Sequence, residues 1–173
     1  MERLLKIFGY IIGGVIGLGV IVYVSFWLML EWHMRPRSYD RNDSEFEAIA
    51  MQPLRGFVCG SIPDGIRVTR YYEKRNFNDG DELWLLEPQR TGAVSELVAL
   101  LKLKSVLPSE YVSQFAYNID NKPDWVIRPR NDMKTLFIDA DMQPSDGANH
   151  CKYGIFYLWS TDGNTFFLYH ITT

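Results

Sequence analysis

The sequence predicts an α+β protein, in which an N-terminal transmembrane helix precedes a domain with an antiparallel sheet of about five strands and one main packed helix. Three observations predict this class. Residues 7–30 contain neither a charged residue nor a proline. The later sequence alternates apolar and polar residues and carries Asp-Gly pairs, which is typical of strands joined by hairpins. Strands come first, a helix follows and strands return, an order that favours α+β over a parallel sheet.

The apolar segment, residues 7–30, is long enough to cross the roughly 30 Å hydrocarbon layer of a bilayer. The short tail, residues 1–6, is basic, and aromatic residues lie near both ends of the apolar segment, as they do at membrane interfaces. The run "GYIIGGVIGLG" is not a dinucleotide-binding loop, because Val22 stands where the third glycine is required. A signal peptide has a shorter apolar core and a small-residue cleavage site. We therefore expect an uncleaved signal anchor in membrane lipid.

Gly9, Gly13 and Gly17 recur at every fourth position, which places them along one face of the helix. Small residues with this spacing allow a second membrane helix to approach closely. The pattern predicts homo- or hetero-association through the transmembrane helix. The alternative is that glycine is common in membrane helices without any such role.

Basic residues near the two ends of the helix are almost equal in number, so the positive-inside rule does not decide the orientation. A short basic tail before an apolar anchor is the usual form of a signal anchor whose N-terminus is cytoplasmic. We therefore expect a single-pass protein of the bacterial inner membrane with its domain in the periplasm. Cys59 and Cys151 could form a disulfide in such an oxidising compartment, or could remain two buried thiols.

A charged tether, residues 31–45, is expected to lead into the domain, residues 46–173. "SEFEAIAMQ" predicts a short helix, with Ser44 as its cap and Glu47 completing a capping box. "GFVCGSI" and "GIRVTRYYEKR" are expected to be strands. Asp79-Gly80 predicts a hairpin that leads into the strand "LWLLE".

The main helix is predicted at "TGAVSELVALLKLK", where Val94, Leu97, Val98 and Leu101 form an apolar stripe. Lysines at positions 102 and 104 are expected in its last turn, near the negative end of the helix dipole. The last strands are predicted at "KTLFIDA", "KYGIFYLWS" and "TFFLYHIT", the final two joined by the Asp162-Gly163 hairpin.

Composition and motifs exclude several classes of function. The net charge of −3 lacks the basic footprint of a nucleic-acid-binding domain, so no nucleic-acid partner is expected. Asp139 and Asp141 do not complete an EF-hand, and no zinc-ligand spacing surrounds His150. No motif of a known hydrolase or kinase is present. We expect no catalytic residue, no metal site and no cofactor.

Aromatic residues crowd the predicted strands, and apolar residues occupy both faces of the last hairpin. Aromatic side chains with polar tips are enriched at protein interfaces. One interpretation is therefore a surface for a protein partner; the other is a small aromatic-rich core. The candidate interface residues are Tyr71, Tyr72, Trp84, Trp159 and Tyr169.

The segment "SIPDGIRVTRYYEKRNFNDGDELWLLEPQ", with the helix, "KPDW" and the final hairpin that follow it, resembles a pattern in small uncharacterised bacterial membrane-anchored envelope proteins and lipoproteins. The resemblance covers roughly residues 60 to 172. It implies an envelope location and a non-enzymatic role, and it assigns no site.

Three hypotheses follow. The first is an extracytoplasmic, non-catalytic binding module, such as an immunity-type protein that neutralises a toxin. The second is an accessory subunit of a membrane complex, held by the face of Gly9, Gly13 and Gly17. The third is an envelope hydrolase that uses Asp139, Asp141 or His150.

Overall fold

The computed structural model describes residues 2–58, 61–75, 80–108, 122–130, 133, 135–139 and 155–172. The chain divides into two units, Met1–Arg35 and Pro36–Thr173. The first unit is a single helix, α1 (Glu2–Met34). It is longer than the predicted span at both ends, because residues 2–6 of the expected tail precede the span and the first residues of the expected tether continue it. The helix ends ahead of Pro36, since a proline disfavours helical backbone in the residue before it.

The segment Phe8–Met34 of α1 is long and apolar enough to cross a membrane. None of it is buried within the chain, and large apolar side chains are exposed all along it. Near its end, Arg35 Nη2 donates a hydrogen bond to Glu31 Oε1 at 3.2 Å, a pair one helical turn apart.

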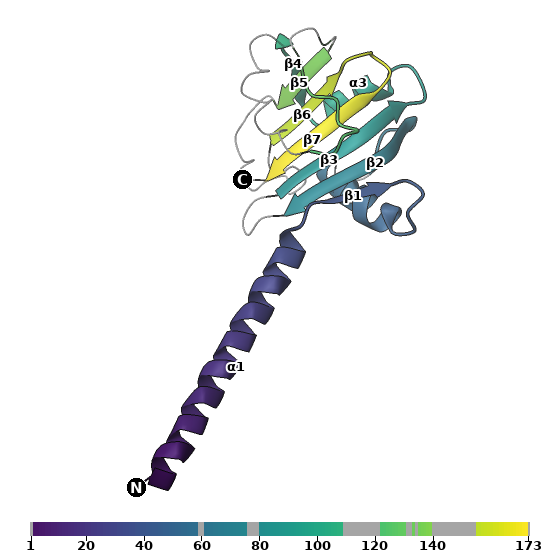
Figure 1. The fold of residues 1–173 in the computed structure, drawn as a ribbon. Coiled ribbons are helices and arrows are strands. Elements are labelled where there is room, and N and C mark those ends of the chain that lie inside the picture. The colour runs from purple at the N-terminus through teal and green to yellow at the C-terminus, as the bar shows by residue number, and fades with distance from the viewer. Residues whose placement is uncertain are drawn as a thin grey trace. The chain divides into compact units, whose positions relative to one another are not determined.

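The second unit is an α+β domain built on one antiparallel sheet (Figure 1). The predicted class is confirmed, but the sheet has seven strands where about five were expected. In chain order the strands are β1 (Arg37–Asp40), β2 (Ile66–Arg75), β3 (Gly80–Pro88), β4 (Leu103–Ser105), β5 (Thr135–Asp139), β6 (Ile155–Ser160) and β7 (Phe166–Thr172).

The order of strands across the sheet is β1-β2-β3-β7-β6-β5-β4, and every neighbouring pair is antiparallel. Strands β1, β2 and β3 thus form one half of the sheet in chain order. The chain then continues to β4 at the opposite edge, and β5 and β6 follow from that edge toward the centre. The last strand in chain order, β7, takes the central position and joins the two halves. Figure 1 shows this strand in yellow between β3 and β6.

Both predicted pairs of neighbouring strands are present. In the first, Arg75 of β2 is opposite Gly80 of β3, and Asp79 lies outside the described residues. In the second, Gly163 adopts a left-handed φ of 84°, which a residue without a Cβ adopts at no steric cost. The Asp162 carboxylate accepts hydrogen bonds from the backbone N–H groups of Asn164 and Thr165, each at 2.8 Å, and these contacts lower the pKa of Asp162.

Three helical segments belong to the domain: η1 (Glu47–Met51), a π-helical turn, α2 (Gln52–Phe57) and α3 (Ala93–Leu100). The helix expected at "SEFEAIAMQ" is present as η1, continuing into α2. Its cap is Phe46, which makes no side-chain capping hydrogen bond, so the predicted capping box of Ser44 is wrong. The strand expected at "GFVCGSI" is also wrong. Gly56 and Phe57 end α2, and no strand includes the residues of this segment that the structure describes.

The main helix, α3, is confirmed but shorter than expected. Leu97 and Leu101 of its predicted stripe are fully buried. The helix ends at Leu100 because Lys102 adopts a left-handed φ of 52°, and the chain then enters β4. Lys102 and Lys104 therefore lie beyond the last turn of α3, not within it.

Two apolar clusters form the core, one on each face of the sheet. On the helical face, η1, α2 and α3 pack against residues such as Trp84, Phe156 and Leu168. On the opposite face, residues 122–130, here called the strap, contribute Val126 to the cluster, and Met133 adds to it. We call this opposite face the strap face.

Candidate functional site

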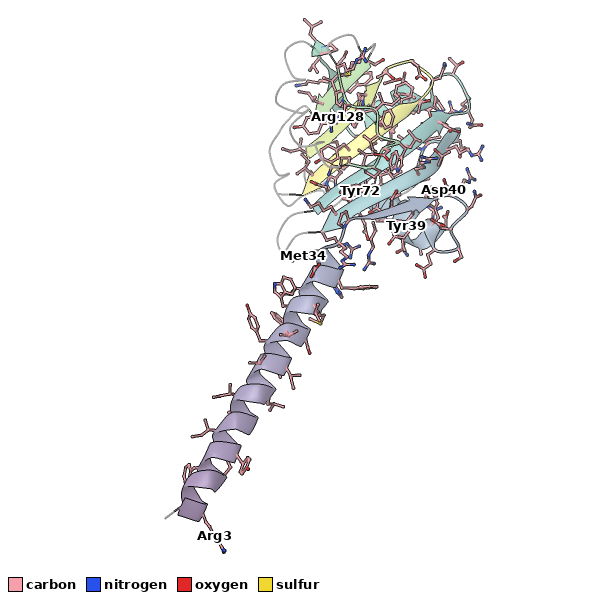
Figure 2. The ribbon with its side chains drawn as sticks, viewed as in Figure 1. Arg3, Met34, Tyr39, Asp40, Tyr72 and Arg128 are labelled. Carbon is pink, nitrogen blue, oxygen red and sulfur yellow. The ribbon has the colours of Figure 1, made fainter. Side chains whose placement is uncertain are left out.

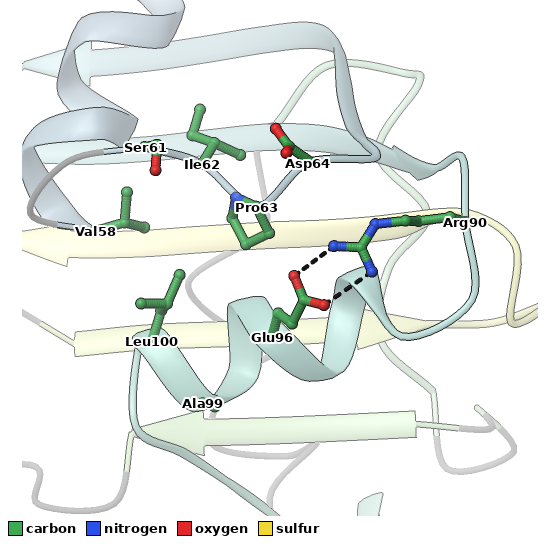
Figure 3. A pocket seen from close by; sticks show the side chains of 9 residues that line it. All are labelled: Val58, Ser61, Ile62, Pro63, Asp64, Arg90, Glu96, Ala99 and Leu100. Atoms are coloured by element: carbon green, nitrogen blue, oxygen red, sulfur yellow. Dashed lines mark hydrogen bonds and ion pairs between the residues drawn. The ribbon is translucent and has the colours of Figure 1, made fainter.

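The candidate site is a groove between α3 and the segment that enters β2 (Figure 3). Its volume is about 630 Å³. Figure 3 shows an apolar end, where Val58 faces Leu100, and a charged end at Asp64, Arg90 and Glu96. The residues that line it are Val58, Ser61, Ile62, Pro63, Asp64, Arg90, Glu96, Ala99 and Leu100.

Gly65 shapes the charged end of the groove. Its φ of 85° lies in the left-handed region, and its carbonyl accepts a hydrogen bond from the Gln89 N–H at 2.6 Å. A Cβ at this position would lie only 2.5 Å from Cγ of Arg90. The missing side chain therefore lets the aliphatic part of Arg90 cross close to the backbone.

The charged end is an ion pair with two parallel hydrogen bonds. Arg90 donates from Nη1 to Glu96 Oε1 at 2.8 Å and from Nη2 to Glu96 Oε2 at 2.6 Å. This geometry matches the planar guanidinium to the carboxylate. The hydrogen bond raises the pKa of Arg90 and lowers the pKa of Glu96, so both groups stay charged at neutral pH.

The Arg90–Glu96 pair is not suited to acid–base chemistry. A general base needs a pKa near the working pH, and the pKa of each of these two groups is shifted away from it. Leu100 is 49% exposed, which is high for a leucine and leaves an apolar surface uncovered. An apolar end beside a fixed pair of opposite charges suits a ligand with an apolar side chain and a polar or charged neighbour.

A buried polar network lies on the helical face, across β2, β3 and β7. Glu82 is opposite both Glu73 and His170 in the register. Tyr71 Oη donates to Glu82 Oε1 at 2.8 Å, and His170 Nδ1 lies 3.0 Å from Glu82 Oε2. Burial raises the pKa of Tyr71 far above its usual range, and the charge of Glu82 raises it further.

The imidazole of His170 is only 1% exposed. Its ring centroid lies 4.1 Å from that of Phe57 and 4.5 Å from that of Phe156. These contacts enclose the histidine in the core, so a substrate could not reach it without displacing an aromatic ring. The network therefore lies in the interior of the domain, where it links β2, β3 and β7.

A second polar cluster lies on the strap face. Lys122 Nζ donates to Asp81 Oδ2 at 2.6 Å and lies 4.9 Å from the ring centroids of both Tyr72 and Tyr169. Tyr169 Oη donates to Asp81 Oδ1 at 3.0 Å. Burial lowers the pKa of Lys122, although Asp81 opposes the shift. This cluster fastens the beginning of the strap to the sheet.

The five aromatic residues considered as an interface lie in the interior. Tyr71, Tyr72, Trp84, Trp159 and Tyr169 are between 0 and 3% exposed. Their indole and hydroxyl groups bind within the chain, as in Trp84 Nε1 to the Ala50 carbonyl at 2.8 Å and Trp159 Nε1 to the Ile127 carbonyl at 3.0 Å. They therefore form the aromatic-rich core, and they offer no surface to a partner in this conformation.

The remaining sequence candidates are placed only in part. A Cβ added to Gly9, Gly13 or Gly17 would meet no atom within 4 Å, so this face of α1 is open. Asp139 is the last residue of β5, opposite Leu103. Cys59, Cys151, Asp141 and His150 lie outside the described residues. Within the described part of the chain, no three His, Cys, Asp or Glu side chains are grouped to hold a metal ion.

The groove, the buried polar network and the Lys122 cluster show no local signal in the sequence. Glu82 and His170 are 88 residues apart, and so are Asp81 and Tyr169. Only the pairing of β3 with β7 brings them together. No protein-family model, no curated protein and no solved structure matches the chain.

Proposed function

We propose that the protein is a membrane-anchored, non-catalytic binding protein, with α1 in the bilayer and the α+β domain on the extracytoplasmic side. The observation that carries the proposal is the continuous exposed apolar surface of Phe8–Met34. A helix that is apolar all round is buried either in a protein core or in lipid. None of the described residues buries this helix.

The helix could also act as a cleaved signal, and the two roles are separated by the N-terminus of the mature protein. For an anchor, we expect the full-length chain in the membrane fraction, resistant to carbonate extraction and released only by detergent. A soluble mature protein that begins near residue 30 would contradict the proposal.

The orientation is tested with two fusions after Thr173. A periplasmic domain gives an active alkaline phosphatase fusion and a dark green fluorescent protein fusion. The opposite pair of results would place the domain in the cytoplasm and overturn this part of the proposal.

We propose the groove beside α3 as the surface that binds a protein partner, for instance a toxin that the protein neutralises. Support comes from the exposed Leu100 next to the Arg90–Glu96 pair. An apolar contact supplies binding energy, and a fixed pair of charges supplies orientation.

The groove is tested by photocrosslinking in the full-length protein. With p-benzoylphenylalanine at position 100 we expect a discrete crosslinked partner, which the added substitution Glu96→Arg removes. The control carries the same crosslinker at Lys104, an exposed residue of β4 outside the groove. Equal crosslinking from both positions would contradict a specific site.

A second candidate function, an accessory subunit of a membrane complex, is favoured by the open face of Gly9, Gly13 and Gly17. We expect Gly13→Leu to abolish helix association in a membrane two-hybrid assay. Gly14→Leu is the matched control, because Gly14 is equally open but lies about 100° away around the helix. Association that survives Gly13→Leu would dispose of this candidate.

A further inference from the structure

A second cavity, of about 510 Å³, lies where β1 and the end of β2 meet η1 and α2. Tyr39, Ile49 and Pro53 form its apolar part. Its charged wall consists of Arg37, Glu73 and Arg75. The cavity lies wholly within the domain and is separate from the groove beside α3.

The charges in this cavity favour an anion. Glu73 is buried and already paired, since Arg75 Nη2 donates to its Oε2 at 3.0 Å. The Arg75 side chain is nevertheless 71% exposed, which leaves further N–H donors accessible. Arg37 is exposed and forms no ion pair within the part of the chain that the structure describes. The cavity thus has one positive charge in excess.

The chain path limits how far this cavity can lie from the bilayer. Only Arg35 and Pro36 separate Met34, the last residue of α1, from Arg37. The backbone from Met34 to Arg37 therefore spans at most about 11 Å, whatever the orientation of the domain. Each headgroup layer is roughly 5–8 Å thick. The run of α1 without charged residues ends at Leu30, and the helix continues for about 6 Å beyond it, to Met34. If α1 spans the bilayer, as the proposed function requires, Arg37 lies at most about 17 Å from the edge of the hydrocarbon layer, close to the headgroups.

We propose that this cavity binds the phosphate headgroup of an anionic phospholipid, with Arg37 and Arg75 as the phosphate ligands. A guanidinium presents parallel N–H donors that fit two phosphate oxygens. Phosphatidylglycerol carries a net negative charge that complements the cavity, whereas phosphatidylcholine is neutral overall. The inference rests on the proposed membrane anchor and adds a lipid class to it.

The test measures lipid retained by the full-length protein, purified in detergent and analysed by native mass spectrometry with phosphatidylglycerol or phosphatidylcholine. Each arginine near an anionic lipid surface contributes about fivefold to binding. We expect Arg37→Gln with Arg75→Gln to reduce phosphatidylglycerol retention about twenty-five-fold and to leave phosphatidylcholine retention unchanged. The control, Arg41→Gln with Arg67→Gln, removes the same charge from two exposed residues that line a different cavity, and it should have little effect.

An equal loss in both double variants, or no loss in the first, would overturn the proposal. Inorganic phosphate at millimolar concentration should not displace the lipid; if it does, the ligand is free phosphate and the lipid assignment is wrong. Arg37→Gln alone keeps the Arg75–Glu73 pair, so a selective loss with this variant supports the site even if the double variant misfolds. Membrane fractionation of the unaltered protein reports on the anchor separately, because it does not depend on lipid selectivity.

Discussion

The two faces of the sheet are covered in different ways, although each uses a buried tryptophan for the same task. On the helical face, Trp84 donates to the carbonyl of Ala50 in η1. On the strap face, Trp159 donates to the carbonyl of Ile127 in the strap. The covering helices satisfy most of their own backbone hydrogen bonds, so their apolar side chains suffice to hold them. The strap has no regular hydrogen bonding, so side-chain contacts must fix it.

Those contacts are distributed along the strap. Lys122 binds Asp81 at its beginning (2.6 Å), and Trp125 Nε1 donates to Ser38 Oγ of the edge strand at 3.1 Å. Figure 2 labels Tyr72, under the Lys122 ammonium, and Arg128 near the strap's end. A helix can thus be docked by an apolar stripe, whereas an irregular segment requires polar anchors along its length.

The largest effect is expected from removing residues 168–173, because β7 serves both faces and joins the two halves of the sheet. The truncation removes most of β7, with Leu168 from the helical face and Tyr169 from the strap face. We expect complete loss of cooperative unfolding and of the near-ultraviolet circular dichroism. A truncated protein that still melts cooperatively would show that the two halves are stable without their shared strand.

Alkaline pH should unfold the domain through tyrosines on both faces. Burial raises the pKa of Tyr72 to about 12 and the pKa of Tyr71 and Tyr169 still further. The contribution of these tyrosines to stability is therefore full below pH 10 and falls as pH rises above it, by at most about 1.4 kcal/mol per pH unit for each tyrosine. For Tyr72 the fall ends near its pKa of about 12. The lowered pKa of Lys122 makes stability rise with pH, which opposes this loss. Because Lys122 is one group against three tyrosines, the loss should dominate.

The measurement is a pH titration of the unfolding free energy, with tyrosinate absorbance followed in parallel. Tyr71→Phe should reduce the part of the alkaline loss of unfolding free energy that arises on the helical face. Tyr72→Phe should reduce the part that arises on the strap face. If neither substitution changed the dependence of the unfolding free energy on alkaline pH, the loss could not be assigned to these tyrosines.

On the helical face alone, Leu97→Ala should cost about 2–5 kcal/mol, the range for a fully buried leucine whose removal leaves a cavity. Denaturant unfolding of the detergent-solubilised protein measures it. Leu100→Ala is the matched control in the same helix and should cost well under 1 kcal/mol, because Leu100 is half exposed. Equal costs would mean that α3 is not docked through its predicted stripe.

On the strap face, Lys122→Met should cost about 1–3 kcal/mol, because it leaves Asp81 partly buried with one fewer donor. The double variant Lys122→Met with Asp81→Asn should recover part of that loss, since no carboxylate charge is then left unpaired. A double variant that loses the sum of both single effects would show that the ion pair does not fasten the strap.

The sequence predicted what depends on neighbours in the chain. Asp79-Gly80 and Asp162-Gly163 located two hairpins, and the stripe containing Leu97 and Leu101 located α3. The edge strands β1 and β4 were missed, because "RSYD" and "LKS" are short and show no apolar alternation. Their strand conformation depends on pairing with β2 and β5, which the local sequence does not indicate.

"GFVCGSI" was misassigned because a short apolar run fits either a buried strand or the end of a helix. Phe57 is apolar because it packs on Trp84 and Phe156 from α2. The groove was not predictable for a similar reason. The Arg90–Glu96 pair depends on the left-handed glycine at position 65, whose proximity to Arg90 only the folded loop creates. Residues far apart in sequence thus determine most of the site.

The place of β7 also has a consequence during synthesis. Until this strand leaves the ribosome, β3 and β6 each present an open edge, and the two half-sheets have nothing to join them. Unpaired edges recruit other chains and promote aggregation. The nascent polypeptide must therefore be kept apart from its neighbours while its sheet is still in two pieces.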